Sequence, residues 1–177
     1  MKDSSKGNKE LLPGPSSSIA VPMKNRTITV GVISDTHGLL RPQAIVALQQ
    51  SDFIIHAGDV GDPAILKELK RIAPVTAVRG NIDMDKWAEA LPETMSLKLG
   101  GLTIFTLHNV EHLRIHPQNA EIVIFGHSHK PHNELQDGTL FFNPGSAGPR
   151  RFSLPISVGQ LTIADGKAHG EIVLLKV

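Results

Sequence analysis

The stretch Phe125-Gly126-His127-Ser128-His129-Lys130-Pro131-His132 decides how the rest of the chain is organised. Residues 122–125, which lead into it, are apolar, β-branched and aromatic, and this run predicts a short buried strand that Gly126 ends. His127 and His129 follow at alternate positions, so in an extended backbone both imidazoles point the same way and can reach one site. Because imidazole is the commonest metal-binding side chain, the stretch predicts a metal site. Two solvated loop histidines are the alternative.

The first half of the chain repeats one unit, a buried strand followed by a polar loop. The predicted strands are residues 28–33, 52–56 and 75–78. Helical segments separate them: one runs from Pro42 to about Gln49, and the other begins at Pro63 and is broken by Pro74. Strands that alternate with helices predict a parallel sheet, in which functional residues gather at the carboxyl ends of the strands.

The second half of the chain changes to antiparallel pairing. Strands are predicted over residues 95–99 and 102–107, and the glycine pair between them is typical of a hairpin turn. Asp137-Gly138 and Asp165-Gly166 mark two further hairpins. We therefore expect an α/β fold with two packed β-sheets, flanked by helices, in a single domain.

Composition narrows the class of protein. The 177 residues suffice for one domain, 40% of them are hydrophobic, and the net charge of +1 gives no indication of an extended nucleic-acid surface or of membrane binding. The absence of cysteine excludes disulfides, thiolate metal sites and cysteine nucleophiles. No apolar run is long enough to span a bilayer, and the first residues lack the apolar core of a signal peptide. We expect a cytoplasmic protein with a disordered tail at residues 1–25 and a folded domain at residues 26–177.

Polar residues at the predicted strand ends form the candidate site. They are Asp35, His37, Asp59, Asn81, His108, His127 and His129. Two carboxylates, four imidazoles and one amide can bind two metal ions about 3.5–4 Å apart, the geometry used for in-line displacement at phosphorus. Asp59 is the natural bridge because it is the carboxylate of the middle loop. Asp35 and His37 would then hold one ion, and Asn81 and His108 the other.

Five ordered motifs carry a resemblance to a known family. They are Asp35-Thr36-His37, Gly58-Asp59, Gly80-Asn81-Ile82-Asp83, His108 and Gly126-His127-Ser128-His129. Together they resemble the motifs of the calcineurin-like metallophosphoesterases, above all the small bacterial and archaeal phosphodiesterase branch, over about residues 28–177. The resemblance implies a four-layer α/β/β/α sandwich of two packed mixed β-sheets. It assigns Asp35, His37, Asp59 and His129 to one metal, and Asp59, Asn81, His108 and His127 to the other.

The resemblance implies a metal-dependent phosphoesterase that acts on phosphodiesters. A hydroxide bridging the two ions would attack phosphorus in line, with Asp59 and Asn81 as catalytic residues and with Asn81 and Arg150 steadying the phosphate oxygens. Imidazole-rich ligation favours two divalent transition-metal ions, manganese first and otherwise iron, cobalt, nickel or zinc. The substrate would be a small phosphodiester or nucleotide-like molecule. Homo-oligomerisation stays open.

Formal charge adds a weak preference for diesters. Two divalent ions and two aspartates leave a charge of +2, which a hydroxide and a diester monoanion neutralise, whereas a monoester dianion leaves −1. The alternative function is a non-catalytic metal-binding or protein-interaction scaffold, as in the retromer subunit that shares this fold. Loss of a ligand would favour the scaffold, but every ligand type is in place.

Two positions depart from the family pattern. Ile82 stands where many members have a histidine that helps to protonate the leaving group, so hydrolysis should depend steeply on the stability of the leaving group. If it does not, His132 or a metal-bound water would be the first proton donors to consider. Asn109 follows His108 where the family usually has glycine, and a helix commonly found before the next strand is expected to be lost or shortened.

Overall fold

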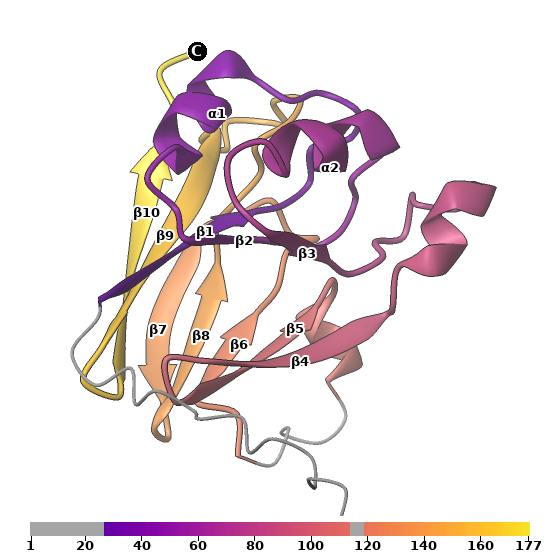
Figure 1. Cartoon of the computed structure of the whole chain (residues 1–177). Coiled ribbons are helices and arrows are strands. Elements are labelled where there is room, and N and C mark those ends of the chain that lie inside the picture. Colours follow the sequence, from indigo (N-terminus) through magenta and orange to yellow (C-terminus); the bar gives the residue numbers. More distant parts are fainter. Residues whose placement is uncertain (1–26, 114–118) are drawn as a thin grey trace, which may run out of the picture.

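Two five-stranded β-sheets packed face to face form the centre of the described chain (Figure 1). The structure is a computed structural model that describes residues 27–113 and 119–177. The predicted tail at residues 1–25 lies outside the described residues. So does the middle of the segment between His108 and the next strand.

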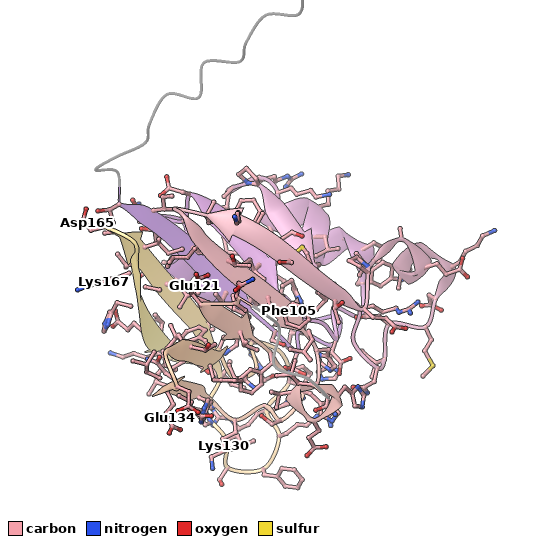
Figure 2. All side chains as sticks on the ribbon, turned by 90° about the horizontal axis from the view of Figure 1, so that it is seen from below. Phe105, Glu121, Lys130, Glu134, Asp165 and Lys167 are labelled. Carbon is pink, nitrogen blue, oxygen red and sulfur yellow. The ribbon has the colours of Figure 1, made fainter. Side chains whose placement is uncertain are left out.

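The first sheet has the strand order β10-β9-β1-β2-β3. Its strands are β1 (Ile28–Ile33), β2 (Phe53–His56), β3 (Val75–Ala77), β9 (Ser157–Ala164) and β10 (Lys167–Leu174). The first three are parallel, as predicted, β9 pairs antiparallel with β1, and β10 pairs antiparallel with β9. The β9–β10 hairpin turns at Asp165, which lies with Lys167 at the outer edge of the molecule (Figure 2).

The second sheet has the strand order β4-β5-β6-β8-β7. Its strands are β4 (Thr94–Leu99), β5 (Leu102–Leu107), β6 (Ile122–Ile124), β7 (His132–Gln136) and β8 (Thr139–Asn143). The two outer pairs are the predicted hairpins, and β5, β6 and β8 are parallel. Both sheets are therefore mixed.

Two layers of apolar side chains hold the sheets and the α-helices together. Residues of β1, β2, β5, β6, β8 and β9 fill the space between the sheets, with Phe142 the largest fully buried side chain. Helices α1 (Pro42–Leu48) and α2 (Pro63–Leu69) pack their buried faces on the outside of the first sheet. Burial of apolar surface on this scale is the main stabilising term of the fold.

The predicted fold class is confirmed. Outside the sheets, the 3₁₀ turns are η1 (Lys86–Ala90) and η2 (Val110–His112). η2 packs on the outer face of the second sheet, so among the described residues the helical cover of that sheet is one short turn. No helix within the described part of the chain is long and apolar enough to cross a membrane.

The pairing of strands places the polar loops together. The backbone N–H of Asp35, after β1, donates to the carbonyl of Gly58, after β2, at 3.0 Å. In the other sheet, the N–H of Gly126 donates to the carbonyl of His108 at 2.9 Å. His127 then donates its N–H to Asp35 Oδ2 at 3.1 Å, which joins the two sheets at their shared edge.

Candidate metal centre

The loops that carry the predicted ligands have an unusual backbone. Five of the seven residues have positive φ: Asp35 (53°), His37 (46°), Asp59 (54°), His127 (67°) and His129 (58°). Left-handed backbone is costly for residues with a Cβ and is found where surrounding structure enforces it, often at functional sites. Here hydrogen bonds between the loops enforce it, and the turns direct five side chains into one space.

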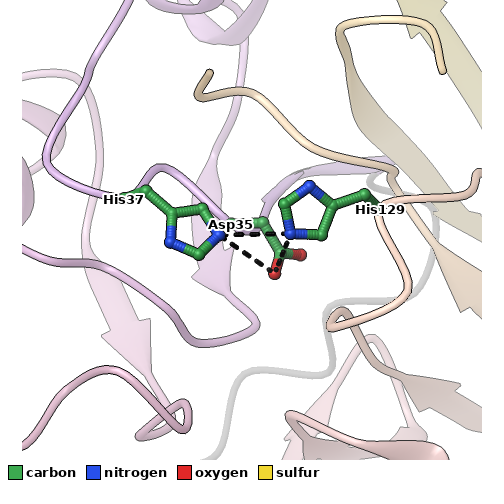
Figure 3. Close-up of side chains that lie close together, drawn as sticks. All are labelled: Asp35, His37 and His129. Atoms are coloured by element: carbon green, nitrogen blue, oxygen red, sulfur yellow. Dashed lines mark hydrogen bonds and ion pairs between the residues drawn. The ribbon is translucent and has the colours of Figure 1, made fainter. Parts of the chain in front are cut away.

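Asp35, His37 and His129 form a first group of converging side chains (Figure 3). The Nε2 atoms of the two histidines are 3.1 Å apart, and Asp35 Oδ1 lies 3.3 Å from His129 Nε2 and 4.0 Å from His37 Nε2. Asp35 Oδ1 is buried and accepts no hydrogen bond from the described residues. A buried carboxylate oxygen without a donor is costly, so its position favours a cation.

Asn81, His108 and His127 form a second group. Asn81 Oδ1 lies 3.0 Å from His108 Nε2 and 2.9 Å from His127 Nδ1. His108 Nδ1 lies 2.7 Å from the carbonyl oxygen of Ala57, which can only accept, so Nδ1 carries the proton of the neutral ring. The lone pair of Nε2 is then free to bind a metal, the arrangement that a carbonyl partner commonly sets in metal-binding histidines.

Asp59 lies between the two groups. Its Oδ2 is 3.7 Å from His37 Nε2, and its Oδ1 is 3.3 Å from His108 Nε2. The backbone N–H of Ile82 also donates to Oδ1, at 3.0 Å, which fixes the carboxylate. One carboxylate therefore faces an imidazole of each group with a different oxygen, as the predicted bridge requires.

Burial and neighbouring charges shift the pKa values of three of these side chains. Burial alone would raise the pKa of Asp59, but hydrogen bonds from His108 and the Ile82 N–H outweigh it and lower that pKa. Burial alone would lower the pKa of His108, but its hydrogen bond to Asp59 and the carboxylate charge raise it. Burial lowers the pKa of His37 despite the two nearby aspartates, which favours the neutral ring that metals require.

The donor set fits transition-metal ions. Two ligand atoms that each bind one ion at about 2.1 Å and at right angles lie about 3.0 Å apart. The shortest separations within the two groups are 3.1 Å and 2.9 Å. All donors are nitrogen or oxygen, and four of the seven side chains are imidazoles, which suits transition metals better than magnesium or calcium.

Three further residues hold the loops in place, and none of them was among the predicted ligands. Asp83 is buried and accepts N–H groups of Val60, Gly61 and Gly80 at 2.9–3.1 Å, so it ties the loop after β2 to the loop after β3. The only signal for it was its place in the Gly80-Asn81-Ile82-Asp83 motif.

Asn143 and His56 act in the same way elsewhere. Asn143 Nδ2 donates to the carbonyl of Gly126 at 2.8 Å and to Ser128 Oγ at 3.1 Å, which fixes the loop of His127 and His129. His56 is fully buried. Its Nε2 lies 2.9 Å from Thr36 Oγ1, and its Nδ1 accepts the Gly58 N–H at 3.2 Å.

Arg150, the predicted phosphate contact, is exposed. Its Nη1 donates to the carbonyl of Leu154 at 3.4 Å, within its own loop. The seven predicted ligands are thus brought together, whereas a role for Arg150 in binding substrate stays a prediction.

A cavity of about 610 Å³ opens beside the second group. Its wall includes Asn81, His108 and His127, together with Arg79 and His112. A volume of this size suits a small-molecule ligand.

Comparison with known proteins agrees with the site. Residues 28–166 match the family described as the Calcineurin-like phosphoesterase superfamily domain, and the chain belongs to this superfamily. A "Probable metallophosphoesterase" of Methanothermobacter thermautotrophicus is 35% identical over 159 residues, which cover 81% of this chain and 91% of that protein. A phosphodiesterase of Methanocaldococcus jannaschii is 28% identical over 166 residues, covering 82% of this chain and 98% of its own.

A solved structure shares the fold at lower identity. Vacuolar Protein Sorting 29 from Cryptosporidium parvum superposes with a TM-score of 0.68 at 20% identity, covering 86% of this chain and 100% of that one. The recognised family and fold are therefore confirmed, and the chain is a metallophosphoesterase-type protein with candidate ligands for divalent metal.

Proposed function

We propose that this protein is a phosphodiesterase that works with two divalent transition-metal ions, manganese first among them. The observation that carries the proposal is Asp59, whose two carboxylate oxygens face His37 of one group and His108 of the other at 3.7 Å and 3.3 Å. A bridging carboxylate of this kind is what a two-metal centre needs. When bound, the ions would supply a hydroxide nucleophile at neutral pH and neutralise charge that develops on the phosphoryl group.

The side chains of the site have separate tasks in this proposal. Asp35, His37, Asp59 and His129 would hold one ion, and Asp59, Asn81, His108 and His127 the other. Asn81 is exposed to the cavity, so its amide N–H can also donate to a phosphate oxygen. The buried backbone hydrogen bonds of the loops keep these groups in position before substrate binds. Such preorganisation is the main contribution that a protein fold makes to electrostatic catalysis.

The substrate proposed is a small phosphodiester or a nucleotide-like molecule in the cytoplasm. The cavity of about 610 Å³ has room for such a molecule. The formal charge of two divalent ions and two aspartates favours a diester monoanion over a monoester dianion. The similarity to a phosphodiesterase of M. jannaschii supports the same class.

The alternative is a binding scaffold on the same fold, which the structural similarity to Vacuolar Protein Sorting 29 keeps open. The phosphodiesterase and the scaffold differ in whether the metal-loaded protein hydrolyses phosphate esters. The test is hydrolysis of bis(p-nitrophenyl) phosphate, p-nitrophenyl phosphate and cyclic nucleotides by protein loaded with manganese, cobalt, nickel, zinc or magnesium. We expect two metal ions per chain and faster turnover of diesters than of monoesters. Metal binding without hydrolysis of any ester would favour the scaffold, and failure to bind any transition metal would contradict the phosphodiesterase and leave the protein-interaction scaffold.

A further inference from the structure

Position 82 does not supply a proton for the leaving group. The Ile82 side chain is apolar and 40% exposed, and its backbone N–H is used by Asp59. When a phosphodiester bond breaks, negative charge develops on the departing oxygen, and a proton donor accelerates the step most when the leaving group is poor. The wall of the cavity shows where another donor lies.

The turn after β5 is built by a residue that departs from the family pattern. Asn109 Oδ1 accepts the backbone N–H of Glu111 at 3.0 Å, and the carbonyl of Asn109 accepts that of His112 at 3.1 Å. A side-chain cap of this kind favours a tight helical turn. Asparagine at this position therefore starts η2 and determines where His112 lies.

The same turn is anchored to the second sheet. Val110 and Leu113 pack against the buried cluster that includes Leu107, Val123 and Phe125. This contact fixes one side of η2, while His112 belongs to the wall of the cavity, together with Asn81, His108 and His127 of the second metal-binding group.

The other candidate donors are less well placed. Arg79 and Glu93 also line the cavity, but they pair with each other at 2.7 Å. His132 packs its ring against Phe125 and lies 3.6 Å from Glu134 Oε2 on β7, and it is not among the residues that form the cavity wall. His112 is exposed, so its ring can exchange protons with solvent between turnovers.

We propose that His112 protonates the leaving oxygen of a phosphodiester bound in this cavity, an inference that rests on the proposed function. As the oxygen of a water bonds to phosphorus, that water releases one proton to solvent, the bond from phosphorus to the leaving oxygen breaks, and the leaving oxygen takes the ring proton of the imidazolium. The products are a phosphomonoester, an alcohol and a neutral imidazole, which regains its proton from solvent. The dependence on leaving group in the unmodified protein is then shallow, in place of the steep dependence expected from Ile82 alone.

The test compares single-turnover rates of His112→Gln and unmodified protein on manganese-loaded samples, with diesters whose leaving groups range from p-nitrophenol to an alkyl alcohol. We expect a loss of about 10²-fold with the alkyl leaving group, the lower range for general acid catalysis. With p-nitrophenol, which leaves without help, the loss should be below about threefold. Imidazole in the buffer should restore part of the rate in His112→Ala. His169→Gln, at an exposed position on β10, is the matched control and should change neither rate.

A second readout does not depend on turnover. In zinc-loaded protein, the imidazole signals of His112, identified by their loss in His112→Gln, should shift when phenylphosphonate binds, while those of His169 stay in place. Equal rate losses for all leaving groups, or His112 signals that ignore bound phosphonate, would overturn the proposal while leaving the phosphodiesterase intact. No hydrolysis by the unmodified protein and no effect of phosphonate on any histidine would instead overturn the proposed function, and this inference with it.

Discussion

Asp59 shows how one residue combines a conformational cost with a chemical task. Its φ of 54° places it in the left-handed region, which aspartate tolerates better than most residues because its short side chain bonds locally. In return its carboxylate lies between two groups of imidazoles, where each oxygen faces a different one. Gly80 packs so closely against it that a Cβ at position 80 would collide with the Asp59 backbone and carboxylate.

We predict that Asp59→Asn lowers turnover by about 10²–10³-fold, because it weakens two-metal catalysis. Asparagine accepts the same backbone conformation, but it has one acceptor oxygen where the bridge needs two anionic ones. Metal content and turnover should be measured on the same samples. His129→Ala should weaken the binding of one metal ion and leave the binding of the other unchanged.

The matched control for this prediction is Asp165→Asn. Asp165 has a φ of 50° in the β9–β10 turn at the outer edge of the molecule, so the substitution repeats the chemistry and the backbone conformation far from the site. Near-normal turnover in Asp59→Asn would show that this carboxylate does not bridge.

At the scale of elements, the site depends on how the loops after β2 and β3 are joined. Asp83 is 3% exposed, and its two oxygens accept three backbone N–H groups from these loops. Buried N–H groups that lose their acceptors cost free energy, and the loops carry Asp59 and Asn81. The junction therefore links stability to the geometry of the site.

We predict that Asp83→Asn lowers the free energy of unfolding by about 1–3 kcal/mol, because the amide group faces N–H donors with one oxygen too few. The same substitution should also weaken binding of the metal ion that Asn81, His108 and His127 would hold. Urea unfolding in the presence of a chelator measures the first effect and metal titration the second. Asp137→Asn, in the β7–β8 turn, is the control. Unfolding that matches the unmodified protein would mean that the three hydrogen bonds contribute little.

At the scale of the whole molecule, local patterns predicted most of the fold. The predicted strands at residues 28–33 and 102–107 coincide with β1 and β5, because continuous apolar runs and turn glycines are signals within a few residues. Helix α2 ends at Leu69, before the predicted break at Pro74. The seven candidate ligands could be named because each follows a strand, and strand ends of a parallel sheet meet at one edge.

What the sequence could not predict depends on contacts between distant segments. Asp83 acquires its role from N–H groups more than twenty residues away as well as from its own loop. His112 was not among the predicted site residues, because nothing near it in the sequence indicates that Asn109 caps a turn beside a cavity. Such positions follow from packing of the complete chain, which periodicity and motif spacing do not describe.

The final prediction concerns the pH dependence of folding stability, through His56. Complete burial lowers the pKa of His56 from 6.5 to about 4. Above pH 6.5 the ring is neutral in both states and stability is complete. Between pH 6.5 and 4 the ring binds a proton in the unfolded chain but not in the folded one. The free energy of unfolding therefore falls by about 1.4 kcal/mol per pH unit, and the total loss at pH 4 is about 3 kcal/mol.

The hydrogen bonds of His56 explain why the folded protein resists this proton. Nδ1 accepts the Gly58 N–H, so a proton on Nδ1 would break that bond and leave a charge in the core. Denaturant unfolding of chelator-treated protein from pH 7.5 to 4.5 should show a steeper fall for the unmodified protein than for His56→Gln, although the variant is less stable at pH 7.5. Other histidines, including His37 and His108 with their opposite pKa shifts, are present in both proteins and largely cancel in the difference. Parallel curves for the two proteins would show that His56 is protonated as readily in the folded state as in the unfolded one.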